Sequence, residues 1–560
     1  MRPLVAILSI LAACNDGGDA TVDASTTDTA DTASDTHAVD VVTTGVITCA
    51  DPSARDEAVF DEVQAAGEAP KPSWFWGGGI LTGDLDGDGY LDIILPGLYR
   101  TDLYRGGPDG VFSLDADALQ GLPAAAASGG SVADYDGDGD LDVLITRYNQ
   151  PNTLLRNDDG ALIDVSTSAG LPTEARRTMG SSWGDLDGDG DLDLFLGNYG
   201  EIDQSGEDPD HATFDPADPS WLLLNNGDGT FTDVSTRLPQ QAHDGYTFSG
   251  GFLDVDRDGD EDLYIVNDFG NSFPNVLLEN QGDGELVLGD QRGLDIPMTG
   301  MGLGVGDLNH DGYPDMAMTA WNGNYLVESA LEGTLWVDHS DAAGIENDIG
   351  RTQKVAWGVE LVDMDNDGDL DAPMAYGYLD STYQASTRQP DALYLQLDDG
   401  TFLDVAPAWG LNHPTIGRGF AAVDTNNDGW LDIIKRDLDG PTIYSRSRCG
   451  TAAWLRVRLH QPVGMNRFAV GAHVRVVTGD KLQERTIFAG TLNHSSGGPP
   501  EVHFGLGGNE VVDRIEVQWP DGTIDVVSSL DGAPISARQV LDLTRHMDDD
   551  GSSPTTPPGR

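Results

Sequence analysis

Residues 84–92 read D-L-D-G-D-G-Y-L-D, and variants of this stretch recur along the chain. The repeats begin at Asp84, Asp134, Asp185, Asp254, Asp307, Asp363 and Asp424. A glycine-rich segment precedes each one, and an apolar run such as Ile93-Ile94-Leu95 follows it. A period of roughly 50 residues with several short strand signals is the size of one four-stranded propeller blade. The sequence therefore predicts an all-β fold with a seven-bladed β-propeller over residues 49–448.

The ends of this region predict how the ring closes. Several repeats end in the phrase Phe-x-Asp-Val, which the seventh lacks, and the same phrase stands before the first loop as Phe60-Asp61-Glu62-Val63. We expect this N-terminal strand to complete the last blade, which favours a closed propeller over an open β-solenoid. Cys49 and Cys449 flank the seam, so we predict a disulfide between them.

Each loop follows the pattern D-x-[DN]-x-D-G-x-x-D, which suits a calcium ion. Calcium takes six to eight oxygen ligands, and the side chains at positions 1, 3, 5 and 9 with the carbonyl of position 7 can wrap one ion. The predicted ligands, loop by loop, are Asp84, Asp86, Asp88, Tyr90 and Asp92; Asp134, Asp136, Asp138, Asp140 and Asp142; Asp185, Asp187, Asp189, Asp191 and Asp193; Asp254, Asp256, Asp258, Asp260 and Asp262; Asp307, Asn309, Asp311, Tyr313 and Asp315; Asp363, Asp365, Asp367, Asp369 and Asp371; Asp424, Asn426, Asp428, Trp430 and Asp432.

Two further observations favour calcium in these loops. Carboxylates about 4 Å apart repel by roughly 1 to 4 kcal/mol per pair, so the loops need a cation. An EF-hand would need a glutamate at position 12 and flanking helices, whereas position 12 is Leu95 in the first loop and Lys435 in the last. We expect about seven calcium ions with a structural role; magnesium fits less well because it keeps its waters.

The formal net charge of −65 argues against nucleic-acid partners, because such a field repels phosphates. Residues 1–14 are predicted to be a signal peptide whose end, Leu11-Ala12-Ala13-Cys14, resembles the bacterial lipobox. Cys14 would then carry a lipid that anchors the protein at the outer membrane or cell surface, with the periplasmic face left open; an ordinary secretory signal is the alternative. Residues 15–48 are predicted to be a disordered, acidic, Ser/Thr-rich tether, and residues 546–560 a disordered tail.

The loops and their flanking phrases resemble FG-GAP/VCBS repeats, the type found in integrin α-chain propellers, and this resemblance implies calcium in each blade. Residues 451–545 form a second β domain, in which Asn466–Ala472, Val502–Gly507 and Val517–Gly522 resemble the ASPIC/UnbV domain. The whole chain is similar to bacterial lipoprotein members of the cartilage acidic protein-like family. Phe468 departs from that pattern, since an acidic residue is usual there. Residues 441–485 are rich in Lys and Arg, and we hypothesise that this basic sheet docks on the acidic propeller; a solvated β face with alternating charge is the alternative.

No catalytic constellation stands out. Gly180-Ser181-Ser182-Trp183-Gly184 matches G-x-S-x-G but runs directly into a predicted calcium loop, and a nucleophile elbow needs a helix there. We therefore expect a non-enzymatic, monomeric binding or adhesion module for a glycan or protein ligand. The alternatives are a scaffold for a partner protein and a polysaccharide-active enzyme. The acidic insertion at about residues 200–220 is either a decorative loop or a candidate ligand loop.

Overall fold

The computed structural model describes residues 39–56, 59–64, 78–122, 126–201, 217–289, 291–321, 323–345, 354–379, 388–438, 440–490 and 492–546. The chain divides into Met1–Thr36 and His37–Arg560, and all described residues lie in the second part. Cys14, most of the predicted tether, most of the acidic insertion and the tail after residue 546 lie outside the described residues.

Most of the described chain forms antiparallel units of four strands, numbered here from one to seven along the chain; the second and third are hydrogen-bonded to each other in one eight-stranded sheet. Unit one contains β3 (Leu81–Gly83), β4 (Asp92–Leu95), β5 (Asp102–Arg105) and β6 (Ser113–Asp115). Unit two contains β7 (Ala127–Ala133), β8 (Asp142–Gln150), β9 (Thr153–Asp158) and β10 (Ala161–Asp164). Unit three contains β11 (Arg176–Gly184), β12 (Asp193–Asn198), β13 (Trp221–Asn225) and β14 (Phe231–Asp233). Unit four contains β15 (Tyr246–Leu253), β16 (Asp262–Asp268), β17 (Val276–Asn280) and β18 (Leu286–Leu288).

The remaining units repeat this order. Unit five contains β19 (Gly300–Gly306), β20 (Asp315–Ala320), β21 (Tyr325–Ala330) and β22 (Leu335–Asp338). Unit six contains β23 (Ala356–Val359), β24 (Ala372–Tyr376), β25 (Ala392–Gln396) and β26 (Phe402–Asp404). Unit seven contains β27 (Gly417–Val423), β28 (Asp432–Asp437), β29 (Ile443–Ser447) and β2 (Phe60–Gln64). Short helices are η1 (Pro52–Asp56), η2 (Pro108–Gly110), η4 (Ser235–Arg237), α1 (Gln240–Asp244), α2 (Ser340–Ala343) and α3 (Ala406–Trp409).

Apolar side chains pack between neighbouring units, and this packing confirms the predicted all-β, propeller-type fold. Leu144 of unit two and Leu194 of unit three belong to one buried cluster, as do Phe195 of unit three and Leu263 of unit four. A further cluster contains Ile93 of unit one together with Ala421 and Ile434 of unit seven, at the other end of the repeat region. The first and last units are therefore in contact.

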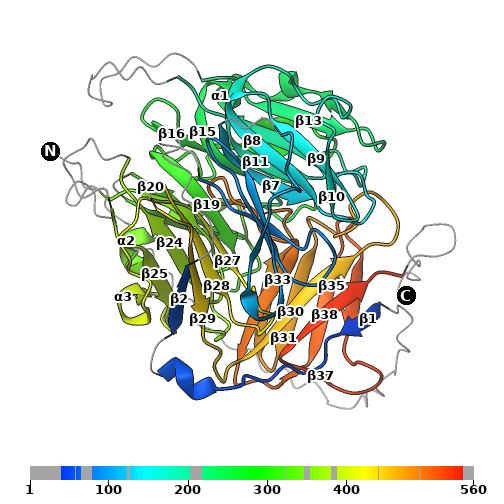
Figure 1. The fold of residues 1–560 in the computed structure, drawn as a ribbon, viewed down its shortest axis with the longest axis vertical. Coiled ribbons are helices and arrows are strands. Elements are labelled where there is room, and N and C mark those ends of the chain that lie inside the picture. Colours follow the sequence, from blue (N-terminus) through cyan, green and yellow to red (C-terminus); the bar gives the residue numbers. More distant parts are fainter. Residues whose placement is uncertain are drawn as a thin grey trace, which may run out of the picture. The chain divides into compact units, whose positions relative to one another are not determined.

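The N-terminal strand closes the seam as predicted. β2 pairs antiparallel with β29 from Phe60↔Ser447 to Gln64↔Ile443, so residues far apart in sequence complete unit seven (Figure 1). Close to this pairing, Cys49 and Cys449 form a disulfide with a Cα–Cα distance of 5.7 Å. Strand pairing and a covalent bond therefore join the two ends of the repeat region.

The C-terminal domain is a two-sheet sandwich. Its strands are β30 (Ala453–His460), β31 (His473–Thr478), β32 (Lys481–Thr486), β33 (Glu501–Gly507), β34 (Val511–Val512), β35 (Arg514–Gln518), β36 (Ile524–Val527), β37 (Ile535–Ser536) and β38 (Gln539–Thr544). One sheet has the order β32-β31-β35-β36, and the other contains β38, β30 and β33. Leu455, Val474 and Ile515 are fully buried between them.

The prediction that the tether is disordered is wrong at the C-terminal end of this segment. Asp40–Thr43 forms strand β1, which pairs antiparallel with β38 and extends the second sheet (Figure 1). Val39 and Val41 pack against the core of the C-terminal domain. The acidic composition of the segment concealed this short run of β-branched residues, which gains apolar burial and a row of backbone hydrogen bonds.

A loop of the C-terminal domain contacts the innermost segments of several units. This inserted loop comprises residues 489–498, of which residue 491 is not described. Gly497 donates its N–H to Ile80 O of unit one at 2.9 Å, and Val359 N of unit six donates to Asn493 Oδ1 at 2.9 Å. Ser495 Oγ donates to Met179 O of unit three at 3.1 Å. Residues 492–498 are all buried, so this loop fills the space between the inner strands.

The described helices include none with the length and apolar character that a bilayer crossing requires.

Candidate metal centres

Each aspartate loop connects the first strand of a unit to its second, as in Asp84–Asp92 between β3 and β4. Position 1 organises the turn: Asp84 Oδ1 accepts the N–H of Asp88 at 3.1 Å, and Oδ2 accepts that of Gly89 at 2.9 Å. The same two hydrogen bonds recur in the other six loops. Gly89 has a φ of 89°, a left-handed conformation that glycine adopts without strain.

Position 9 ties the loop to the rest of its unit. Asp142 Oδ2 accepts the N–H of Tyr135 at 3.0 Å, and its Oδ1 accepts that of Asn157, on the third strand, at 2.8 Å. Equivalent pairs of bonds are made at Asp92, Asp193, Asp262, Asp315, Asp371 and Asp432. These carboxylates are nearly inaccessible, so the fold itself holds them inside the loops.

Five loops bring three carboxylates close enough to share one ion. The carboxylate oxygens of each of the following groups lie within 4.8 Å of one another: Asp84, Asp86 and Asp88; Asp134, Asp136 and Asp142; Asp185, Asp187 and Asp193; Asp254, Asp256 and Asp262; Asp363, Asp365 and Asp371. The loops of units five and seven form no such group, because Asn309 and Asn426 replace the aspartate at position 3.

In three loops, a carboxylate oxygen of the residue at position 3 is direct evidence for a cation site. Oδ1 of Asp136, of Asp187 and of Asp256 is buried and has no hydrogen-bond partner among the described residues. A buried carboxylate oxygen without a partner is costly, and a hard cation is the ligand that relieves it. These residues therefore fit calcium.

Burial also perturbs the ionisation of the loops. It raises the pKa of Asp142 to about 9 and the pKa values of Asp193 and Asp262 to about 8, and neighbouring loop carboxylates add to the increase. A bound divalent cation would favour the ionised form and so lower these pKa values.

The residue at position 7 of each loop is expected to bind calcium through its backbone carbonyl oxygen. Some of the side chains at this position have another role. Asp140 Oδ2 accepts the N–H of Asp159 in the turn between β9 and β10 at 2.7 Å. Asp191 and Asp260 approach the corresponding glycines, Gly227 and Gly282. These carboxylates support the neighbouring turn.

Arginines beside two loops were missed by the sequence analysis. Arg105 Nη1 lies 2.7 Å from Asp92 Oδ2 in unit one, and Arg456 Nη1 lies 3.2 Å from Asp424 Oδ2 in unit seven. Arg105 lies on the strand next to that of its partner, and Arg456 belongs to the other domain. The spacing of residues in the sequence therefore predicts neither ion pair.

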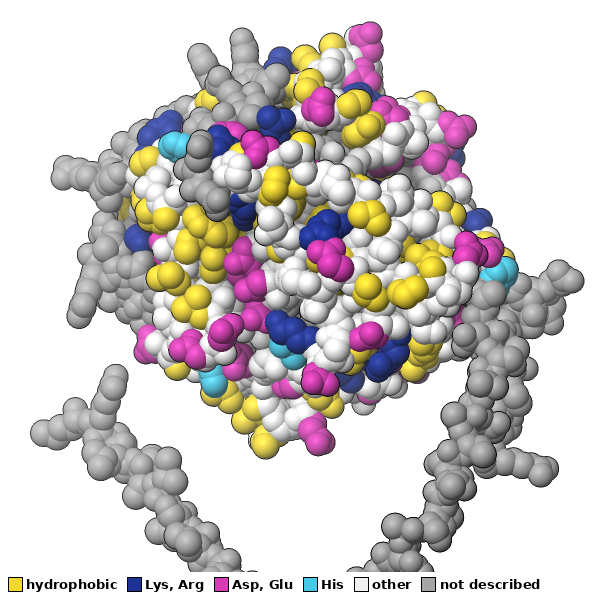
Figure 2. Space-filling view, turned by 90° about the horizontal axis from the view of Figure 1, so that it is seen from below, with side chains coloured by type: hydrophobic (Ala, Val, Ile, Leu, Met, Phe, Trp, Pro, Cys, Tyr) yellow, Lys and Arg dark blue, Asp and Glu magenta, His cyan; other side chains and the backbone are white. Residues whose placement is uncertain are grey.

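The C-terminal domain contacts several of the loops, and the charges at these contacts come from both sides. Arg467 Nε donates to Gly137 O at 2.8 Å, and Lys481 Nζ lies 3.1 Å from Asp369 Oδ1. Arg257 of the fourth loop forms an ion pair with Glu484. Acidic and basic side chains also alternate on the face shown in Figure 2.

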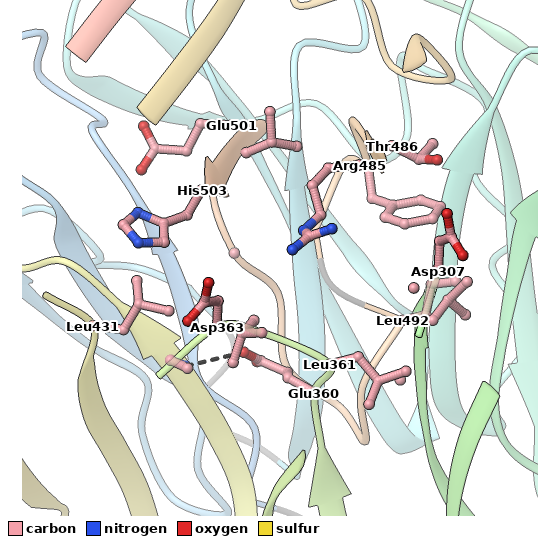
Figure 3. A pocket seen from close by; sticks show the side chains of 18 of the residues that line it. Asp307, Glu360, Leu361, Asp363, Leu431, Arg485, Thr486, Leu492, Glu501 and His503 are labelled. Carbon is pink, nitrogen blue, oxygen red and sulfur yellow. Dashed lines mark hydrogen bonds between the residues drawn. The ribbon is translucent and has the colours of Figure 1, made fainter. Parts of the chain in front are cut away.

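A cavity of about 180 Å³ lies where the inner strands of units five to seven meet the C-terminal domain. Its lining includes Asp307, Asp363 and Asp424, the first residues of three loops. In the view of Figure 3, Arg485 extends into the cavity between His503 and Asp307. Burial lowers the pKa of the Arg485 guanidinium, which Asp363 and Asp307 partly offset.

Comparison with known proteins identifies both regions. Residues 84–145, 134–196, 207–265 and 254–318 match the FG-GAP-like repeat, and residues 462–544 match the ASPIC and UnbV domain. The chain is 25% identical over 515 residues to cartilage acidic protein 1 of Xenopus tropicalis, covering 85% of this chain and 75% of that protein. It is 25% identical over 512 residues to cartilage acidic protein 1 of Mus musculus, covering 86% and 75%. A solved Agrocybe aegerita lectin is similar with a TM-score of 0.39 and 17% identity, covering 59% of this chain and 79% of the lectin.

Proposed function

Because the chain joins FG-GAP-like repeats to an ASPIC and UnbV domain and is related to cartilage acidic protein 1, we propose that it is an exported, calcium-binding, seven-bladed binding module. The observation that carries the calcium assignment is the burial of Asp136, Asp187 and Asp256 Oδ1 without partners among the described residues. The disulfide between Cys49 and Cys449 supports export, since such bonds persist in oxidising compartments. Cys14 would anchor the protein through a lipid.

The ions would have a structural role. Each would offset the crowded negative charge of its loop and allow the position 9 carboxylate to stay ionised while it holds two backbone N–H groups. The C-terminal domain contacts these loops, so calcium would also stiffen the contact between the two domains. Calcium suits these sites better than magnesium because the loops supply many oxygen ligands, whereas magnesium prefers to keep its waters.

Chelation and pH test this assignment together. Because the pKa values of Asp142, Asp193 and Asp262 are raised, the ion-free folded state binds more protons than the unfolded state. The stability that these three carboxyl groups contribute is therefore fully present below about pH 4 and is lost as the pH rises towards about 9. We expect Tm in chelator to fall between about pH 5.5 and pH 9, and Tm in excess calcium to change much less. Parallel melting curves in chelator and calcium over this range would contradict the assignment.

We propose that the ligand, a glycan or protein, binds at the ends of the inner strands away from the loops. Among the described residues, the inserted loop fills the centre and the C-terminal domain contacts several of the aspartate loops, which leaves the opposite ends of the inner strands as the candidate surface. An aromatic cluster lies there, with Tyr199 and Tyr246 buried and Phe273 and Trp321 partly exposed. Aromatic faces stack on sugar rings and also anchor protein interfaces.

Substitution of Trp321 by alanine tests the location. We expect at least tenfold weaker capture on a glycan array, or of a protein ligand on cells, by a variant that still folds with the circular dichroism of the unchanged protein. Leu331→Ala is a matched control, because Leu331 is an exposed apolar residue in a turn of the same unit. Equal capture by both variants would place the ligand elsewhere.

A further inference from the structure

Unit seven carries a charged residue where the other units are apolar. Counting from the first aspartate of each loop, position 12 is Leu95, Ile145, Leu196, Ile265, Met318 and Met374 in units one to six, and Lys435 in unit seven. Lys435 lies on β28, and its side chain is only 4% exposed. It forms an ion pair with Asp391, the residue directly before β25 of unit six. The pair therefore bridges two neighbouring units.

Asp391 lies directly before the third strand of its unit. In unit four, the residue at this place also contacts position 12 of the next unit. Asn275, directly before β17 of unit four, donates its Nδ2 to the sulfur of Met318 of unit five at 3.4 Å. In units six and seven Asp391 and Lys435 replace this amide and thioether. The fold thus places the carboxylate of Asp391 in unit six next to the amine of Lys435 in unit seven.

As an ion pair, this arrangement is incomplete. A lysine ammonium has three N–H donors, yet Asp391 is the only hydrogen-bond acceptor of Lys435 within the described part of the chain. The surroundings are mostly apolar: a void of about 20 Å³ beside the pair is lined by Met374, Leu411, Phe420 and Ile433, with His413 and Ser445 as the other polar side chains. Burying two charges in such a site is costly unless their remaining donors and acceptors are satisfied.

We propose that Lys435 and Asp391 join in an intramolecular isopeptide bond. The ammonium first gives a proton to the carboxylate, which leaves a neutral amine and a carboxylic acid. The Lys435 nitrogen then attacks Cγ of Asp391; a C–N bond forms, the bond from Cγ to Oδ2 breaks, and Oδ2 leaves as water with the carboxyl proton and one proton from nitrogen. The product is a neutral secondary amide, so no oxidant or other reactant is needed.

The structure already holds the groups that this step requires. Tyr376 donates its N–H to Asp391 Oδ1 at 3.0 Å, which fixes the carboxyl and would stabilise negative charge on Oδ1 during the attack. Burial raises the pKa of Asp391, although Lys435 opposes this, and a raised pKa favours the acid form. Asp437 lies two residues from Lys435 on β28, and its carboxylate is held in an ion pair with Arg388, with 2.7 Å between Nη1 and Oδ2. The void is large enough for one water molecule, which needs ~10–15 Å³.

Such a bond would fasten units six and seven to each other covalently. The disulfide and β2 already tie the N-terminal segment to unit seven, so the new bond would add a covalent link from unit seven to unit six. A covalent bond there would persist when calcium is removed.

Mass spectrometry of the purified full-length protein tests the proposal. We expect a tryptic species in which the peptides containing residues 391 and 435 are joined and lighter by one water than their sum. Asp-Gly sequences can also lose water, but they stay in one linear peptide, so the cross-linked species is decisive. Lys435→Met, which restores the residue of unit six, and Lys435→Arg, which keeps the charge, should both abolish it. Two separate peptides of full mass from the unchanged protein, including after prolonged storage, would show an ion pair only and overturn the proposal.

Discussion

Replacing Gly129 by alanine should destabilise the protein by about 3 kcal/mol and release the inserted loop. A Cβ at this position would lie 2.3 Å from Ser495 O and 2.4 Å from Ser495 Cβ. Gly129 needs no left-handed backbone, so the effect would come from the close approach of the loop. The measurement is a denaturant melt together with limited proteolysis, which should cut between β32 and β33 in the variant.

Gly508→Ala is the matched control, because a Cβ there meets nothing within 4 Å. We expect this variant to melt within about 0.5 kcal/mol of the unchanged protein and to resist cleavage between β32 and β33. If Gly129→Ala behaves in the same way, the inserted loop does not occupy the space between the inner strands in solution.

Replacing Asp193 by alanine should cost about 3 to 5 kcal/mol, because it removes a metal ligand and leaves two buried donors without an acceptor. Those donors are the N–H groups of Leu186 and Asn225, at 3.0 and 2.8 Å from the carboxylate. Asp191→Ala, two residues earlier, is the control, because position 7 is expected to supply a carbonyl oxygen. A thermal or denaturant melt in excess calcium should separate the two variants clearly; similar curves would contradict the assigned role of position 9.

The sequence predicted the parts of this molecule that repeat. Loop spacing located the turn between the first and second strands of each unit, and the stray phrase at Phe60–Val63 predicted the closing strand. Both signals are local and recur several times, so a chance match is improbable.

Contacts between distant segments were harder to predict. The inserted loop contains no charged residue between Ala489 and Gly498, which is unusual in so acidic a chain, but this signal does not reveal what the loop contacts. Arg456 looked like one of many alternating charges on a strand, and only the docking of the domains brings it to Asp424. Strand β1 was hidden by the composition around Val39 and Val41.

The account depends most on calcium occupying the aspartate loops, and native mass spectrometry counts those ions directly. For the protein in calcium we expect at least the five ions that the preformed carboxylate groups can hold, and one fewer for Asp193→Ala but not for Asp191→Ala. A protein that is folded in calcium and carries no ion, or the same number in all three forms, would contradict it.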